Sequence, residues 1–214
     1  MQVFSAASLT DRDFEQILSF LRAGGVIGFP TDTAYGLGAD PWNEAAVRQI
    51  FKIKGRSEDK PILLLIDSFE MLEQLAFIPK DLHELTDKFW PGPLTMILPA
   101  REATVLSSIT GGSGTVGVRW PCAPFALRLV KALRKPITAT SANRTGMGSA
   151  VTADEVRFQL NGRLDLLIDG GTLPARGGST LLDLSVDPPV LLRQGPVSLA
   201  ALQEAMNGRI RLSN

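Results

Sequence analysis

Short apolar runs alternate with helical patterns along the whole chain, and this alternation constrains the fold more than any other feature of the sequence. Apolar residues recur at helical spacing over 10–22 and 43–54, whereas 26–29 and 62–66 are continuous apolar runs of strand length. The connections are short, and no repeat, low-complexity tract or change of composition marks a linker. The sequence therefore predicts one α/β domain over residues 1–214.

Two pairs of expected strands follow one another without a helix between them. The first pair is 95–98 and 115–118, and the second is 180–184 and 190–192. Alternation alone predicts a parallel, doubly wound sheet, whereas strands in direct succession indicate antiparallel pairs. We therefore expect a three-layer α/β (α+β) fold with a twisted mixed sheet flanked by helices. The Thr-, Ser- and Gly-containing stretch 104–114 is expected to be a mobile loop.

Composition excludes several classes of protein. The 22 basic and 22 acidic residues balance, so no global positive field favours nucleic acid or an anionic membrane. A single Cys122 and a single His83 can form neither a disulfide framework nor a zinc cluster, and no metal site is expected. No leader peptide and no apolar stretch of membrane-spanning length is present, which predicts a cytoplasmic protein without a membrane partner.

Three short polar segments lie far apart in the chain, each where an apolar run or helical pattern has just ended. They are 30–38, 54–56 and 141–143. A strand that stops at a hydroxyl-rich loop leaves N–H and O–H groups pointing out of the sheet edge. Lys54 and Arg56 supply the positive charge that phosphate or carboxylate needs. Together the segments predict an anion site.

Each of these features also has an ordinary structural explanation. The stretch 31–38 is compatible with a turn in which Asp32 bonds nearby backbone. Lys54 and Arg56 are compatible with a solvated helix end that complements the helix dipole. Arg119, at the end of an expected strand, could form a salt bridge with an acid elsewhere in the chain. Their joint occurrence in one order is what favours a functional site.

Seven motifs follow one another from the first expected helix to the last. They are Phe29-Pro30-Thr31-Asp32-Thr33 through Tyr35-Gly36-Leu37-Gly38, Lys54-Gly55-Arg56, Trp90-Pro91-Gly92-Pro93-Leu94-Thr95, Thr115-Val116-Gly117-Val118-Arg119, Ser141-Ala142-Asn143, Gly178-Ser179-Thr180 with Asp183, and Leu192-Arg193-Gln194-Gly195. In this order the chain resembles the YrdC-like threonylcarbamoyl-AMP synthases (L-threonylcarbamoyladenylate synthases). The resemblance implies the YrdC/RibB-like fold, and the chain looks like the single-domain form of the family.

The resemblance implies a nucleotidyltransferase. Members of the family condense L-threonine, bicarbonate or CO2, and ATP into threonylcarbamoyl-AMP and pyrophosphate, for the threonylcarbamoyladenosine modification of tRNA. Mg²⁺ would accompany the nucleotide, and the implied partners are the downstream tRNA threonylcarbamoyl-transferase machinery, with weak binding of tRNA itself. Displacement at the α-phosphorus depends on positioning and on cations, so a catalytic His or Cys is not required.

The resemblance also implies roles for the residues that match its motifs. The implied catalytic residues are Lys54, Arg56, Ser141 and Asn143. The implied ATP-binding residues are Arg56, Lys60, Thr115, Ser141, Ser149 and Arg193. L-threonine would be held by Thr33, Arg119, Ala139 and Ser179, with the Arg119 guanidinium gripping its carboxylate. Leu65 departs from the pattern, because many relatives place a histidine there near the amino-acid pocket.

Two other functions remain open at the level of sequence. A concave surface could grip the phosphates of a structured RNA through Lys54, Arg56, Arg119 and Arg193, as in an RNA-binding module for tRNA or double-stranded RNA. Such a module would bind RNA tightly, with a steep salt dependence and no consumption of ATP. Alternatively, a fold relative could have kept the cleft and act on another small anionic substrate.

Overall fold

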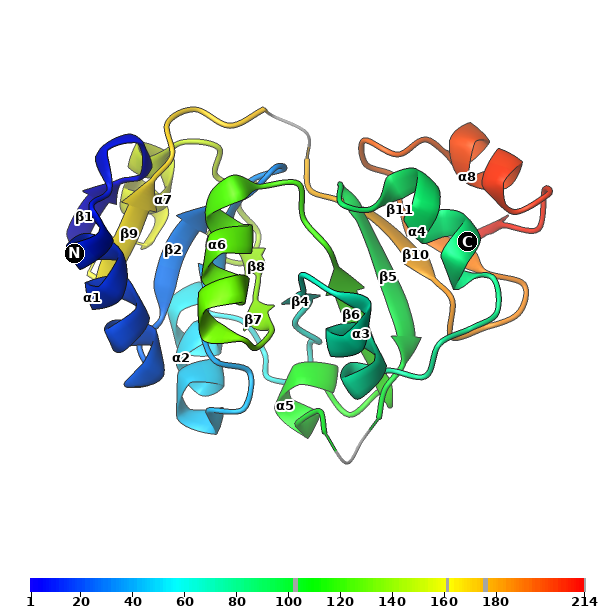
Figure 1. The fold of residues 1–214 in the computed structure, drawn as a ribbon, viewed down its shortest axis with the longest axis horizontal. Coiled ribbons are helices and arrows are strands. Elements are labelled where there is room, and N and C mark those ends of the chain that lie inside the picture. Colours follow the sequence, from blue (N-terminus) through cyan, green and yellow to red (C-terminus); the bar gives the residue numbers. More distant parts are fainter. Residues whose placement is uncertain (102–103, 161, 175–176, 214) are drawn as a thin grey trace.

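Helices and strands alternate along the chain in the computed structural model, which describes residues 1–101, 104–160, 162–174 and 177–213 (Figure 1). The helices are α1 (Asp11–Arg22), α2 (Glu44–Lys54), α3 (Phe69–Leu75), α4 (Leu82–Phe89), α5 (Ser107–Thr110), α6 (Pro124–Leu133), α7 (Ala153–Leu160) and α8 (Leu199–Ala205), with a 3-10 turn η1 (Ala6–Ser8). The strands are β1 (Gln2–Ser5), β2 (Ile27–Pro30), β3 (Tyr35–Gly38), β4 (Leu64–Leu65), β5 (Leu94–Pro99), β6 (Thr115–Arg119), β7 (Ile137–Thr138), β8 (Thr140–Ser141), β9 (Leu166–Asp169), β10 (Thr180–Asp183), β11 (Val190–Arg193) and β12 (Arg211–Leu212). The predicted α/β class is confirmed.

The strands form two mixed sheets where the sequence predicted one. The five-stranded sheet has the order β1-β9-β2-β3-β8, and the seven-stranded sheet has the order β12-β11-β10-β5-β6-β4-β7. Parallel pairs such as β1 with β9 and β10 with β5 occur beside antiparallel pairs. The expected antiparallel pairs, β5 with β6 and β10 with β11, are both present.

The two sheets meet at Ala139, where the chain leaves β7 of one sheet and enters β8 of the other. Figure 1 shows both short strands near the middle of the molecule, between the two groups of longer strands. The fully buried Thr138 hydroxyl accepts a 2.9 Å bond from the Ala39 N–H and donates to the Leu37 carbonyl at 3.2 Å. These bonds tie the seven-stranded sheet to the end of β3. We call this junction the seam.

Capping residues set the start of several helices. Thr10 and Asp13 form a reciprocal capping box at α1, and the Asn43 side chain caps α2. Ser198 caps α8 in the same way. At the other end of α2, Gly55 adopts a left-handed conformation (φ 59°), which ends the helix and turns the chain toward Arg56. Local polar chemistry therefore fixes where the cationic segment begins.

Three expectations about local structure are wrong. The strand expected over 62–66 is only β4, because Ile62 bonds through its N–H to Ile109 in the neighbouring segment. The expected loop 104–114 contains α5, and within it the Thr104 hydroxyl donates to the Gln74 carbonyl at 2.6 Å. The second half of the polar segment 30–38 is the fully buried strand β3, paired with β2 as a hairpin.

Candidate active site

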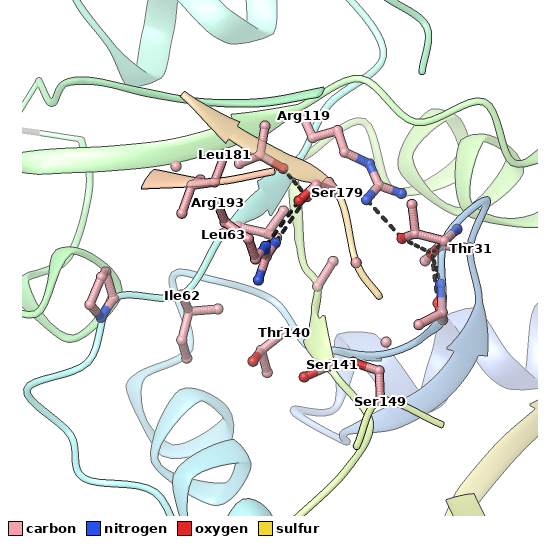
Figure 2. A pocket seen from close by; sticks show the side chains of 18 of the residues that line it. Thr31, Ile62, Leu63, Arg119, Thr140, Ser141, Ser149, Ser179, Leu181 and Arg193 are labelled. Atoms are coloured by element: carbon pink, nitrogen blue, oxygen red, sulfur yellow. Dashed lines mark hydrogen bonds between the residues drawn. The ribbon is translucent and has the colours of Figure 1, made fainter. Parts of the chain in front are cut away.

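A cavity of about 260 Å³ lies at the seam and is lined from both sheets. Most of the predicted site residues line it, and they are Thr33, Arg56, Thr115, Arg119, Ala139, Ser141, Ser149, Ser179 and Arg193. Figure 2 shows Arg119 reaching toward the Thr31 loop and Arg193 beside Ser179, with Ser141 and Ser149 on a separate wall. Residues that are up to 160 positions apart in the chain therefore face one small volume, as the motif order predicted.

Arg119 forms the most enclosed cationic group of this cavity. It lies at the end of β6, and its side chain is only 4% exposed. Nη1 donates to the Thr33 hydroxyl at 3.1 Å, and Nη2 forms an ion pair with Asp32. Burial lowers the pKa of Arg119, while the charge of Asp32 opposes that shift. The acid that the sequence left unplaced is thus Asp32, in the same motif as Thr33.

Ser179 and Arg193 form a second polar cluster together with Thr95. The Thr95 and Ser179 hydroxyls are 2.7 Å apart, and Arg193 Nε donates to the Ser179 carbonyl at 3.0 Å. Gly178 has a φ of +96°, and a Cβ there would lie 3.3 Å from Arg193 Nη2. Thr95 lines the cavity and was not among the predicted site residues. The sequence signal that could have identified Thr95 is its place in the 90–95 motif, beside an apolar strand.

Arg56 lies at the entrance to the β4 segment and faces the cavity from the side of α2. Nη1 donates to the Thr140 hydroxyl at 3.0 Å, and Nη2 donates to the Pro61 carbonyl at 3.0 Å. Partial burial lowers the pKa of this guanidinium, and the charge of Asp59 opposes the shift. Arg56 is thereby held against β8, next to Ser141.

Lys54 does not line the cavity but lies behind its wall, 3% exposed. Its ammonium group donates to the Ser141 carbonyl, to the Asn143 carbonyl at 3.0 Å and to Asn143 Oδ1 at 3.2 Å. Burial, and to a lesser degree the charge of Arg56, lowers the pKa of Lys54 from its usual 10.5 to about 7. In this arrangement Lys54 shapes the turn that carries Ser141.

Asn143, Lys60 and Leu65 also lie outside the cavity lining. The Asn143 amide donates to the Arg144 carbonyl at 3.1 Å and to the Met147 carbonyl at 2.5 Å, so this side chain holds the loop between Ser141 and Ser149. Lys60 is exposed. Leu65 is fully buried in β4, where it belongs to the hydrophobic core cluster that contains Ile137 and Ala139.

The cavity combines cationic and hydroxyl groups with an apolar wall. Arg56, Arg119 and Arg193 contribute guanidinium groups, and the described lining residues include no Asp or Glu. The apolar part includes Pro61, Ile62, Leu63, Ile97 and Leu181. Such a lining suits a ligand with anionic groups and an apolar body. Across the described ranges, no group of three or more His, Cys, Asp or Glu side chains is placed to hold a metal ion.

The model of the Sua5/YciO/YrdC family, described as "Telomere recombination", matches residues 19–195. The chain belongs to this family. A relative within the Sua5/YciO/YrdC family is the threonylcarbamoyl-AMP synthase of Pyrococcus abyssi, 44% identical over 194 residues that cover 90% of this chain and 56% of the relative. The threonylcarbamoyl-AMP synthase of Bacillus subtilis is 38% identical over 213 residues, covering 99% of this chain and 61% of the relative.

Solved structures of the Sua5/YciO/YrdC family share the fold. P. abyssi Sua5 complexed with L-threonine superposes with a TM-score of 0.93 at 40% identity, covering 100% of this chain and 63% of that one. E. coli YciO superposes with a TM-score of 0.82 at 28% identity, and the match covers 91% of this chain and 96% of YciO. The chain thus spans about six tenths of the length of the Pyrococcus and Bacillus synthases. Within the described part of the chain, no helix has the length and apolar character to cross a membrane.

Proposed function

We propose that this chain is an L-threonylcarbamoyladenylate synthase. The observation that carries the proposal is the single cavity in which Arg119 and Thr33 occupy one end while Arg56 and Arg193 supply two further guanidinium groups. Two threonylcarbamoyl-AMP synthases among the relatives, and a threonine-bound relative of the same fold, support it. We further propose that residues 1–214 act as one YrdC-like domain.

In the proposed reaction the amino group of L-threonine adds to CO2 with loss of a proton, or reacts with bicarbonate with loss of water, to give a carbamate. A carbamate oxygen then attacks the α-phosphorus of ATP. The new O–P bond forms as the bond to the β-phosphate oxygen breaks, and pyrophosphate leaves. Arg119, Thr33 and Ser179 would orient threonine, with Ala139 at its back. Such a displacement needs in-line positioning and neutralisation of phosphate charge rather than a protein nucleophile.

The nucleotide would lie toward the other groups of the cavity. We assign its phosphates to Arg56, Arg193, Thr115, Ser141 and Ser149, all of which line the cavity. Lys54 and Asn143 would act by holding the turn that carries Ser141, and Lys60 would reach the phosphates from outside. The described lining residues offer no carboxylate to a metal. We therefore propose that Mg²⁺ enters on the phosphates of ATP, and no step here depends on a protein-held ion.

Ligand-dependent thermal stabilisation tests the proposal, because a ligand that binds the folded state raises the midpoint with its occupancy. L-threonine and ATP should each raise the melting temperature, whereas L-serine and GTP should raise it less. Pyrophosphate release should then require L-threonine, bicarbonate and ATP together, and Arg56→Ala should abolish most of it. A full-rate Arg56→Ala enzyme would contradict the ATP-site assignment.

A companion measurement addresses the wider biological role. We propose a cytoplasmic enzyme that supplies the tRNA threonylcarbamoyl-transferase machinery and binds tRNA only weakly. Titration of tRNA binding against salt should give a shallow dependence, because few phosphates would be contacted. Tight binding of tRNA with a steep salt slope, and no consumption of ATP, would favour the RNA-binding module instead.

A further inference from the structure

Asp32 lies on the reverse side of the loop that presents Thr33 to the cavity. Its side chain is about nine-tenths buried and forms an ion pair with Arg119. Asp32 does not line the cavity of the candidate site, whereas Thr31, Thr33 and Arg119 do. It lines a separate groove together with Thr31, Cys122 and Arg128. A ligand in the cavity would therefore meet Arg119 without touching Asp32.

Arg119 is held from two directions by consecutive residues of this loop. Nη1 donates to the Thr33 hydroxyl, and Nη2 bonds to the Asp32 carboxylate. The loop itself is fixed by Thr31, whose hydroxyl donates to the Ala34 carbonyl at 2.6 Å and accepts from the Thr33 N–H at 3.2 Å. Figure 2 shows the Thr31 and Arg119 side chains converging at this side of the cavity. The orientation of the guanidinium plane is thus set by the loop rather than by solvent.

The same pair retains unused hydrogen-bonding capacity. Arg119 Nε and Asp32 Oδ2 are both buried and have no hydrogen-bond partner among the described residues. A buried guanidinium needs a counter-charge, and removing one partner of a buried pair leaves the other charge uncompensated. Asp32 therefore supplies the charge that keeps Arg119 inside the wall of the cavity, while the buried Nε of Arg119 has no partner among the described residues.

From this geometry we propose that Asp32 is a positioning residue that orients Arg119 for the carboxylate of the amino-acid substrate. The inference rests on the proposed function, and Asp32 acts entirely through Arg119. Displacing a group of an active site by about 1 Å can lower the efficiency of the enzyme on the order of 100-fold. Loss of the Asp32 charge should accordingly weaken the binding of L-threonine and leave the binding of ATP nearly unchanged.

The same ion pair has an opposite interpretation. If the Asp32 carboxylate competed with the substrate carboxylate for Arg119, then removing its charge would free the guanidinium and tighten the binding of threonine. The direction of the change in threonine KM therefore separates a positioning residue from a competitor. A residue needed only for folding would leave the threonine KM of the folded enzyme unchanged.

The experiment compares Asp32→Asn and Asp32→Glu with Asp81→Asn. Asp81→Asn is the control, because it removes the ion pair between Asp81 and Arg209, which does not line the cavity. We expect Asp32→Asn to raise the threonine KM by roughly 10- to 100-fold while the KM for ATP stays within about twofold. Asp32→Glu keeps the charge but moves it by one methylene, so its threonine KM should lie between those of Asp32→Asn and the parent. Asp81→Asn should match the parent in both KM values.

Several outcomes would overturn the inference. They are an unchanged threonine KM in Asp32→Asn, a lowered one, or an equal rise in the KM values of threonine and ATP. If Asp32→Asn does not fold, Asp32→Glu decides, because an unchanged threonine KM in that variant also overturns the proposal. Thermal stabilisation of the parent by L-threonine is measured alongside. Its absence would contradict the proposed function itself rather than the role of Asp32.

Discussion

At the scale of single residues, the site depends on cations that are held by backbone and side-chain oxygens away from water. Lys54 is the clearest case, because its ammonium is buried against the Ser141 and Asn143 carbonyls. From the sequence alone, a lysine at the C-terminal end of a helix is expected to be exposed to solvent. The burial of Lys54 could not be predicted from the sequence, since it depends on a turn 87 residues further along the chain.

The lowered pKa of Lys54 predicts a dependence of stability on pH. The folded pKa is about 7 and the usual value is 10.5, so between these values the unfolded chain binds more protons than the folded one. The free energy of unfolding should therefore rise with pH across this window, by at most about 1.4 kcal/mol per pH unit from this group. The Lys54→Met variant has no titratable group at this position, so its free energy of unfolding should not show this rise with pH.

Urea unfolding of the parent and of Lys54→Met at pH 7, 8 and 9 measures this contribution. The difference between the two proteins should grow in favour of the parent as the pH increases. This range stays below the titration of Tyr35, whose pKa is raised to about 12 chiefly by burial. A difference that does not change with pH would show that Lys54 stays fully charged in the folded state.

Replacing Arg119 by lysine should affect one substrate selectively. A lysine ammonium cannot reproduce the planar fork that contacts Thr33 and Asp32 together. Losing one hydrogen bond to a charged group costs about 1.5–3 kcal/mol, which corresponds to a rise in threonine KM of roughly 10- to 100-fold. Steady-state kinetics with each substrate varied in turn would measure it. Arg48→Lys, in a surface pair with Glu44, is the control and should leave both KM values unchanged.

At the scale of elements, strands β10 and β11 approach each other closely beside the cavity because a glycine lies at the point of contact. A Cβ at Gly195, just after β11, would lie 2.5 Å from the Thr180 nitrogen and 2.7 Å from the Ser179 carbonyl carbon. Both are backbone atoms and cannot move aside independently. The close approach of β10 and β11 at this point therefore requires glycine, and it is this approach that brings Arg193 against Ser179.

Gly195→Ala should consequently disturb both halves of the site. Forcing the strand ends apart is expected to lower the free energy of unfolding by about 1–3 kcal/mol and to weaken the binding of both ATP and L-threonine. Chemical denaturation and ligand-dependent thermal shifts would measure the two effects. Gly148→Ala is the matched control, because a Cβ there would meet no atom within 4 Å. Equal behaviour of the two variants would contradict the prediction.

At the scale of the whole molecule, the two sheets are joined at the seam by a small number of buried polar contacts. Thr138→Val keeps the shape of the side chain but removes the acceptor of the Ala39 N–H. Leaving a buried donor without a partner costs about 1–3 kcal/mol. The variant should unfold at correspondingly lower urea concentration, whereas Thr172→Val, at an exposed position, should not. Equal midpoints for the two variants would mean that the Thr138 hydroxyl does not stabilise the seam.

The seam also marks where prediction from sequence reached its limit. Residues 137–140 are continuous in the sequence, yet Thr138 pairs in one sheet and Thr140 in the other. Helix starts, by contrast, depend on local polar groups such as the caps at Thr10 and Asn43. Partition into sheets depends on pairing between distant segments, which no local pattern contains.

The motifs in the sequence include most of the residues that line the cavity. They do not distinguish side chains that form the cavity wall from side chains that lie behind it. Asp32 and Thr33 are neighbours in sequence, and only the loop conformation sends one to the cavity and the other to the reverse side of Arg119. The same limit applies to Lys54 and Asn143, whose polar groups are turned inward to hold a loop. Motifs report which residues are required at a site, and packing decides which of them a ligand can reach.

The crossing of the chain between the sheets has a consequence for biosynthesis. β1 finds its partner only when Leu166 and its neighbours have been made, and the cavity lacks Ser179 and Arg193 until the chain has returned to the seven-stranded sheet. At roughly 5–20 residues per second, several seconds separate the emergence of Arg119 from that of Arg193. During that interval the nascent chain contains Asp32 and Arg119 but lacks Ser179 and Arg193, so the substrate pocket is incomplete. The complete cavity can therefore form only after Arg193 has been made.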